Sequence, residues 1–199
     1  MAATHSSRLE PASRSLLLET ASEAIESQLE RRNAVGPVEA ALPAELREPR
    51  ASFVTLTVAG ELRGCCGTLE PRRPLAIDVW ENARASAFGD PRFPPLGARE
   101  WRRVDLEVSV LSPLERVMVR SESELLARLV PGEHGLVLAW RGSRATFLPK
   151  VWEQLPDPAE FLGHLKRKAG WGAQFWAEDV EVWRYSTESA AAPGANRRP

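Results

Sequence analysis

The chain has 199 residues and a mass of 22.0 kDa, the size of one domain or of one domain with a subdomain. Hydrophobic residues make up 43% and charged residues 27%, so the core needs neither a metal nor disulfides to hold it together. The 26 Lys and Arg residues against 27 Asp and Glu residues give a formal net charge of −1, which disfavours nucleic-acid binding as the main role.

The ends of the chain are unlike its middle. Residues 1–14 are rich in Ala, Ser and Arg, and residues 187–199 read TESAAAPGANRRP. Neither end carries enough apolar area to offset the entropy of ordering, so we expect disordered tails around a single folded body at 15–186. No apolar run approaches the ~20 residues that span a bilayer, and the N-terminus lacks the blocks of a signal peptide. Because two cysteines do not make a secreted disulfide scaffold, we expect a cytoplasmic protein that is not bound to a membrane.

Hydrophobic periodicity predicts the elements of the first half of the body. Apolar residues recur every three to four positions in two segments and alternate in three others. The predicted helices span 15–32 and 74–88, and the predicted strands span 52–58, 62–69 and 104–111. In the first strand Val54 and Leu56 face one way and Phe53, Thr55 and Thr57 the other. The turn at Gly60-Glu61 makes the first two strands a hairpin.

The second half continues with the same mixture. The capping box Ser121-x-x-Glu124 opens a short helix through Leu129. Further elements are a hairpin of 136–140 with 145–148, a helix from Asp157 through Ala169, and a strand over 180–185. Short turns join most neighbouring strands and no regular βαβ rhythm occurs, so we expect an α+β fold with a mostly antiparallel sheet and packed helices.

The segment Leu62–Thr68, LRGCCGT, is the densest group of chemically active residues. Gly64 and Gly67 would bring backbone close to a ligand, and Thr68 adds a hydroxyl. On a regular strand Arg63 and Cys65 share one face, where the guanidinium would favour a thiolate, and Cys66 takes the other; a bulge would reverse this. The alternative is that both cysteines are small buried hydrophobic residues.

Two further segments could complete a site. His134, in the turn GEHG, is either a base for Cys65 or an exposed turn residue. In AFGDPRFPPL, Asp90 and Arg92 either pair with each other in a turn or form a pocket wall facing the cysteine strand. The spacing of the histidines and cysteines fits no metal site, so we expect neither a metal nor a cofactor.

The tryptophans and basic residues near the end of the last predicted helix raise a different possibility. Lys166-Arg167-Lys168 stands close to Trp171, and basic residues beside aromatic ones are typical of RNA-binding surfaces. The alternative is an ordinary solvated helix face with a favourable charge at the helix C-terminus. We favour the second interpretation, because the overall charge is balanced.

Six ordered motifs resemble the AMME chromosomal-region candidate-gene family, whose bacterial and archaeal members are called AmmeMemoRadiSam system protein A. They are LRGCCGT, AFGDPRFPPL, DLEVSVLSP, GEHGLVL, ATFLPKVW and FLGHLKRKAG, and they extend over about 16–185. In that family an aliphatic residue normally follows LRGC, so the resemblance marks Cys65 as the special thiol and Cys66 as a core substitute. Lys150 stands where a glutamine is common, so no role of that amide is carried over.

The resemblance implies an α+β fold with a smaller subdomain and an association with a Memo-type protein and a radical S-adenosylmethionine (radical-SAM) protein. It does not supply a reaction. This chain has no CxxxCxxC motif, so radical chemistry would belong to the partner.

Two hypotheses follow. In the first, the chain is an enzyme or enzyme component that transfers an acyl or similar group to Cys65, with Arg63 as activator and His134 as base. The residues expected to bind its substrate are Gly64, Gly67, Thr68, Asp90 and Arg92. In the second, the chain is a non-catalytic adaptor for the Memo-type and radical-SAM partners, and the LRGC strand is a recognition groove.

Overall fold

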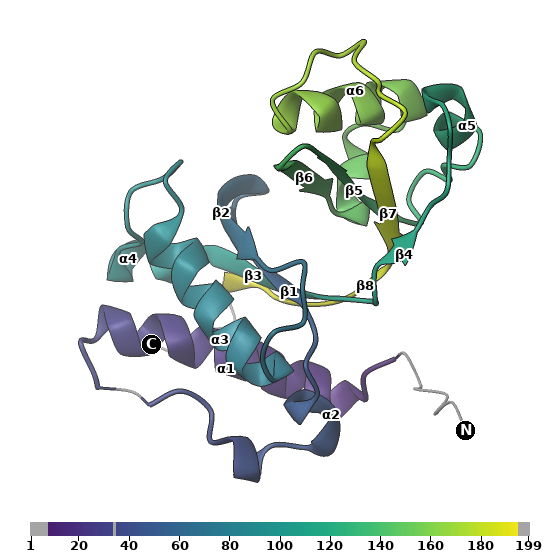
Figure 1. Ribbon diagram of the computed structural model, residues 1–199. Coiled ribbons are helices and arrows are strands. Elements are labelled where there is room, and N and C mark those ends of the chain that lie inside the picture. The colour runs from purple at the N-terminus through teal and green to yellow at the C-terminus, as the bar shows by residue number, and fades with distance from the viewer. Residues whose placement is uncertain (1–7, 34, 195–199) are drawn as a thin grey trace. The chain divides into compact units, whose positions relative to one another are not determined.

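The computed structural model describes residues 8–33 and 35–194 (Figure 1). The described chain divides into two compact units. The first unit comprises the described residues up to Leu111 together with the segment that begins at Glu188, and the second is Ser112–Thr187. Both units combine helices with an antiparallel four-stranded sheet, so the predicted α+β class is confirmed.

The sheet of the first unit has the strand order β2-β1-β3-β8. Its strands are β1 (Ser52–Val58), β2 (Glu61–Gly67), β3 (Val104–Leu111) and β8 (Thr187–Ala192). The bounds of β1 and β3 are those that alternation predicts, and β1 pairs antiparallel with both β2 and β3. Ala59 and Gly60, at φ 52° and 84°, form the tight turn between β1 and β2.

Helices cover one face of this sheet. The helices of this unit are α1 (Pro11–Leu29), α2 (Ala44–Arg47), α3 (Leu75–Arg84) and α4 (Ala98–Trp101), with a 3-10 turn η1 (Glu39–Ala41) and a π-helical turn η2 (Ala85–Gly89). The long helices α1 and α3 pack against each other and against the sheet (Figure 1). Val54 and Leu56 are fully buried in the core beneath them, as the alternation predicts. Phe53, Thr55 and Thr57 belong to the opposite face and are partly exposed.

The sheet of the second unit has the strand order β4-β7-β5-β6. Its strands are β4 (Glu115–Arg116), β5 (Gly135–Trp140), β6 (Ser143–Phe147) and β7 (Glu181–Tyr185). Its helices are α5 (Glu122–Leu126), the 3-10 helix η3 (Pro149–Glu153) and α6 (Pro158–Lys168). The predicted N-caps are present, since the Ser121 and Asp157 side chains accept hydrogen bonds from the backbone N–H groups of Glu124 and Glu160.

Three expectations need correction. The first helix begins at Pro11 rather than Ser15, so the N-terminal tail is shorter than predicted. Residues 187–192, assigned to the C-terminal tail, form β8 at the edge of the first sheet. The helix face with the three basic residues is not entirely solvated, because Lys166 is fully buried and donates to both carboxylate oxygens of Glu122. Residues 1–7 and 195–199 of the predicted tails lie outside the described residues.

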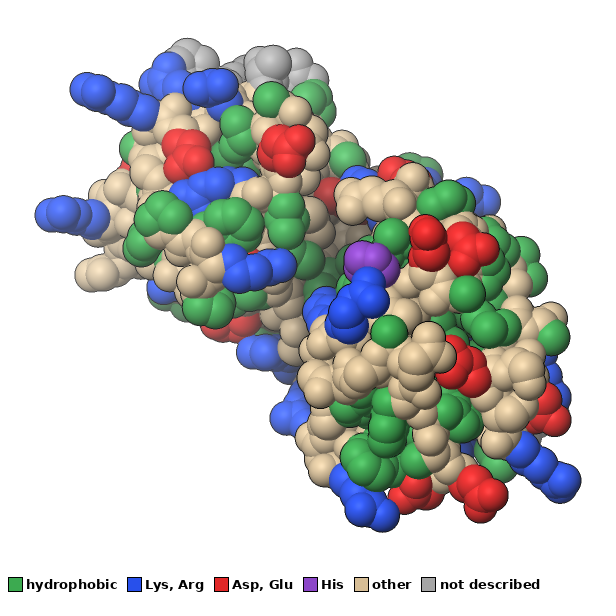
Figure 2. All heavy atoms as spheres, turned by 90° about the horizontal axis from the view of Figure 1, so that it is seen from above, with side chains coloured by type: hydrophobic (Ala, Val, Ile, Leu, Met, Phe, Trp, Pro, Cys, Tyr) green, Lys and Arg blue, Asp and Glu red, His purple; other side chains and the backbone are tan. Residues whose placement is uncertain are grey.

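The face shown in Figure 2 carries side chains of both charge signs. On the face shown in Figure 2, Lys and Arg side chains lie between Asp and Glu side chains, as the net charge of −1 suggests. None of the helices in the described part of the chain has the length and apolar character needed to cross a bilayer.

Candidate functional site

The motif LRGCCGT forms β2, an edge strand of the first sheet that contains a bulge. Cys65 lies opposite Thr55 and Gly64 opposite Leu56, but Leu62 is the partner of Thr57. Arg63 is therefore the extra residue in the bulge. The predicted alternation, which places Arg63 and Cys65 on one face, holds only for a regular strand and is broken here.

The two glycines of the motif allow close packing on both faces of the strand. A Cβ atom on Gly64 would lie 2.2 Å from the backbone oxygen of Ser86, and one on Gly67 would lie 2.3 Å from the ring of Phe53. Real side chains do not approach this closely, so β2 can sit against η2 and Phe53 only with glycine at these positions. Their use as a substrate-binding backbone stays a prediction.

The two thiols face opposite sides of the sheet. The Cys65 sulfur lies 3.6 Å from the Thr55 hydroxyl, on the face turned away from α1 and α3, and Cys65 is partly exposed. Cys66 lies opposite Val54, on the helix side, and its N–H donates to the Ser86 hydroxyl at 2.8 Å. Burial raises the pKa of the Cys66 thiol, and the nearby Asp90 charge adds to the rise.

Asp90 joins the segment after η2 to the cysteine strand. Its side chain is almost fully buried, and one carboxylate oxygen accepts a 3.0 Å hydrogen bond from the Cys65 N–H. Arg92 donates to both carboxylate oxygens, at 2.9 and 2.6 Å, and this pairing holds the pKa of Asp90 well below its usual range. Asp90 and Arg92 therefore pair in a turn, as one interpretation predicts, and they also contact the cysteine strand. Their role as the wall of a substrate pocket stays a prediction.

Arg63 points to a different partner. Its Nε donates to Glu100 at 2.5 Å, and Nη2 donates to the Glu100 carboxylate at 3.0 Å and to the Pro94 carbonyl at 2.8 Å. This pairing lowers the pKa of Glu100. The cation beside the thiols is instead Arg92, whose Nη2 donates to the Cys65 carbonyl at 3.3 Å and whose charge opposes the rise in the Cys66 pKa.

Thr68 ends the motif inside a buried polar network. Its hydroxyl donates to the carboxylate of Asp78 at 2.8 Å, and Asp78 is fully buried. The same carboxylate also accepts hydrogen bonds from Ser52, Arg73 and Asn82. These bonds tie the end of β2 to the start of β1 and to α3, so Thr68 has a clear structural role, and its role in substrate binding stays a prediction.

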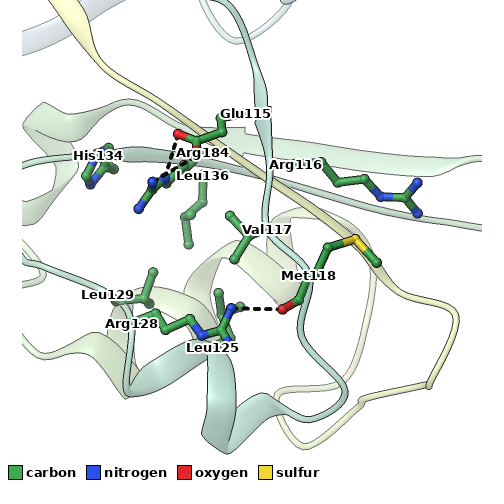
Figure 3. A pocket seen from close by; sticks show the side chains of 10 residues that line it. All are labelled: Glu115, Arg116, Val117, Met118, Leu125, Arg128, Leu129, His134, Leu136 and Arg184. Atoms are coloured by element: carbon green, nitrogen blue, oxygen red, sulfur yellow. Dashed lines mark hydrogen bonds and ion pairs between the residues drawn. The ribbon is translucent and has the colours of Figure 1, made fainter.

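His134 belongs to the second unit. Its carbonyl accepts a hydrogen bond from the Trp152 indole at 2.8 Å, and its ring lies 3.8 Å from the Glu133 carboxylate. The ring lines a pocket of this unit together with Glu115 and Arg184 (Figure 3). Cys65 belongs to the first unit, so the assignment of His134 as its base stays a prediction.

Two residues outside the predicted motifs, Thr55 and Ser86, also contact the cysteines. Thr55 pairs with Cys65 on one side and with Glu107 of β3 on the other, so a thiol, a hydroxyl and a carboxylate form one row across the sheet. Alternation placed Thr55 on this face but gave no reason to select it. Ser86 bridges the two strands, because its hydroxyl accepts from the Cys66 N–H and donates to the Val54 carbonyl. Within the described residues, no group of three His, Cys, Asp or Glu side chains is placed to hold a metal ion.

Comparison with known proteins gives a consistent result. The profile of the AMMECR1 family matches residues 18–190. A protein of Methanothermobacter thermautotrophicus is 38% identical over 149 residues, which are 74% of this chain and 78% of that one. A protein of Thermotoga maritima is 39% identical over 150 residues, which are 74% and 81% of the two chains. The crystal structure of an uncharacterized protein from Pyrococcus horikoshii superposes with a TM-score of 0.86 at 30% identity, covering 93% of this chain and 98% of the other.

Proposed function

The chain belongs to the AMMECR1 family, and we propose that it is an enzyme, or a component of one, whose reacting group is the thiol of Cys65. One observation carries the proposal: the Cys65 sulfur lies beside the Thr55 hydroxyl on the sheet face turned away from the helices, while the Cys65 N–H donates a hydrogen bond to the buried carboxylate of Asp90. A partly exposed thiol can be reached by a substrate, and nucleophilic catalysis needs in addition a base or a nearby cation that favours the thiolate.

The chemistry that fits these groups is transfer of an acyl or similar group. The Cys65 sulfur attacks the carbonyl carbon, a carbon–sulfur bond forms, the bond to the leaving group breaks, and the thiol proton passes to a base. Both guanidinium groups have carboxylate partners, Arg63 with Glu100 and Arg92 with Asp90. Arg92 takes the role predicted for Arg63, because it also donates to the Cys65 carbonyl. His134 remains the candidate base of this proposal.

A second candidate is a non-catalytic adaptor for a Memo-type and a radical-SAM protein. It is favoured by the internal hydrogen bonding of the motif, since Arg63 and Thr68 and the N–H groups of both cysteines are bonded within the first unit. Groups bonded in this way stabilise a strand and leave few donors for a substrate. On this hypothesis the partly exposed face with Phe53, Thr55 and Cys65 is recognised as a surface.

The reactivity of Cys65 distinguishes the two candidates. The full chain is treated at neutral pH with iodoacetamide and with p-nitrophenyl acetate, and mass spectrometry locates the adducts. The catalytic proposal expects Cys65 to react faster than glutathione, with Cys66→Ser retaining this rate and Cys65→Ser losing it. If Cys65 reacts no faster than glutathione, the catalytic proposal fails. Retention of the Memo-type and radical-SAM partners by Cys65→Ser in a pull-down would then support the adaptor.

A further inference from the structure

The second unit contains a pocket whose lining residues all belong to that unit and include His134. It has a volume of about 290 Å³ and lies between α5 and strands β4, β5 and β7 (Figure 3). This volume is near the lower end of the range for small-molecule sites, about 300 Å³. The pocket therefore has room for a small ligand.

Aliphatic side chains make up one part of the lining. Leu125 of α5 and Leu136 of β5 are fully buried and belong to the core of the unit. The remaining apolar lining is Val117, Met118 and Leu129. Met118 is 70% exposed, which is high for a large apolar side chain, and methionine adapts readily to the shape of a ligand. A ligand with a short apolar portion would bury this apolar surface.

Most of the charges around the pocket are already neutralised. Arg184 donates two hydrogen bonds of 2.9 Å to Glu115, and the pair lowers the pKa of Glu115. Arg116 is paired with Glu181 at 3.0 Å. These two guanidinium groups already have carboxylate partners within the protein.

Arg128 is the exception. Its guanidinium donates to the backbone carbonyl of Met118 at 2.9 Å, which is an uncharged partner, and it forms no ion pair within the part of the chain that the structure describes. Figure 3 shows this guanidinium at the edge of the pocket, next to the apolar side chains of Leu125 and Leu129. A guanidinium presents several donors in one plane and binds a carboxylate with two parallel hydrogen bonds.

We propose that this pocket binds a small monocarboxylate with an apolar body, whose carboxylate pairs with Arg128 and whose body contacts Val117, Met118 and Leu129, above the buried side chains of Leu125 and Leu136. One guanidinium without an ionic partner matches one negative charge. The apolar lining of four aliphatic side chains and Met118 matches a short hydrocarbon chain or a single ring. The proposal rests on residues of the second unit alone and does not depend on the reactivity of Cys65.

Hexanoate is the probe that tests the proposal, in a titration of the full chain followed by NMR of its methyl groups. We expect saturable shifts of the Val117, Leu125, Leu129 and Leu136 methyl resonances. Hexanol, which has the same body without the charge, and acetate, which has the charge without the body, should each bind at least about tenfold more weakly. Hexyl phosphate should not bind more tightly than hexanoate.

Variants separate the contribution of the charge from that of the pocket. Arg128→Gln should weaken hexanoate binding about tenfold and leave hexanol unchanged. Arg167→Gln, which removes an exposed guanidinium of α6 outside the pocket lining, is the matched control and should bind hexanoate normally. Val117→Phe, which fills the pocket and keeps Arg128, should abolish the binding of both hexanoate and hexanol.

Three results would overturn the proposal. They are equal binding of hexanoate and hexanol, tighter binding of hexyl phosphate, and methyl shifts that are absent at millimolar hexanoate. Thermal unfolding of each variant verifies that it is folded.

Discussion

The carboxylate of Asp90 accepts the backbone N–H of Cys65 at 3.0 Å, although 25 residues separate the two in the chain. Arg92 holds the carboxylate from the other side through its backbone N–H and its guanidinium. The outer edge of β2 at Cys65 is thereby capped by the buried Asp90 carboxylate and its half-exposed partner Arg92 rather than left open to another strand. The position of Cys65 thus depends on the ionisation of Asp90.

Replacing Asp90 with asparagine tests this dependence. Asp90→Asn keeps the shape but loses the charge, so it should lower the free energy of unfolding at pH 7 by about 1–3 kcal/mol. Urea unfolding measures the change. Glu61→Gln, an exposed carboxylate of the same strand, is the control and should change stability by less than about 0.5 kcal/mol.

The contribution of Asp90 should also depend on pH. The folded protein holds the pKa of Asp90 below its unfolded value of about 3.9, so the ionised carboxylate stabilises the fold fully above that value. This stability is lost as the pH falls from about 4 toward the lower folded pKa. Urea unfolding at pH 7 and at pH 3 should therefore show a smaller difference between the wild type and Asp90→Asn at pH 3. A difference that stays constant would contradict the assignment.

Close packing at Gly64 gives a second prediction. A Cβ atom there would lie 2.2 Å from the Ser86 carbonyl oxygen, which is backbone and cannot move aside cheaply. Gly64→Ala should cost about 1–3 kcal/mol through overpacking. Gly89→Ala in the same unit, where a Cβ meets nothing within 4 Å, should be close to neutral. Thermal unfolding compares the two variants, and equal melting temperatures would show that β2 and η2 do not pack as described.

Cys66 should be the slower of the two thiols. Burial raises the pKa of Cys66, so a smaller fraction is thiolate at pH 8 than in an ordinary cysteine. In Cys65→Ser, which retains only this thiol, alkylation by iodoacetamide at pH 8 should be slower than that of glutathione. Unfolding in urea should bring the rate to that of an ordinary thiol. A folded rate equal to the unfolded rate would mean that Cys66 is not held on the helix side.

The sequence predicts well those features that depend on local pattern. The bounds of β1 and β3 were predicted because one face of each strand packs on a core, which places apolar residues at every second position. The pairing of Asp90 with Arg92 was also foreseeable, since the two stand two residues apart in a turn with three prolines. Strand β8 could not be predicted, because the sequence TESAAA has little strand propensity. It forms a strand by pairing with β3 at the edge of the sheet.

The candidate site shows the same division. The LRGCCGT motif indicates Cys65 as a candidate site residue. The residues that contact Cys65 and Arg63, however, lie far along the chain. Arg63 pairs with Glu100, which is 37 residues away, and no local rule indicates that this ion pair removes the guanidinium from the thiol. The position of the bulge at Arg63 could not be predicted either, because the register shift depends on how β2 pairs with β1.

The buried pair of Lys166 and Glu122 permits a prediction in which the two partners are not equivalent. Lys166 is fully buried and donates to both Glu122 oxygens and to the Phe175 carbonyl, whereas the Glu122 side chain is 30% exposed. Glu122→Gln leaves a buried ammonium without its counter-charge and should cost about 3 kcal/mol or more. Lys166→Met removes the buried charge and leaves a carboxylate that water can reach, so it should cost less.

The double variant completes the test. Because Lys166→Met removes the charge that Glu122→Gln leaves unpaired, the double variant should be more stable than Glu122→Gln alone. Urea unfolding followed by tryptophan fluorescence measures all three, since Trp152, Trp171 and Trp176 belong to the same core as α6. If Lys166→Met costs as much as Glu122→Gln and the two costs add, the ammonium is not desolvated and the pair contributes no more than an exposed salt bridge.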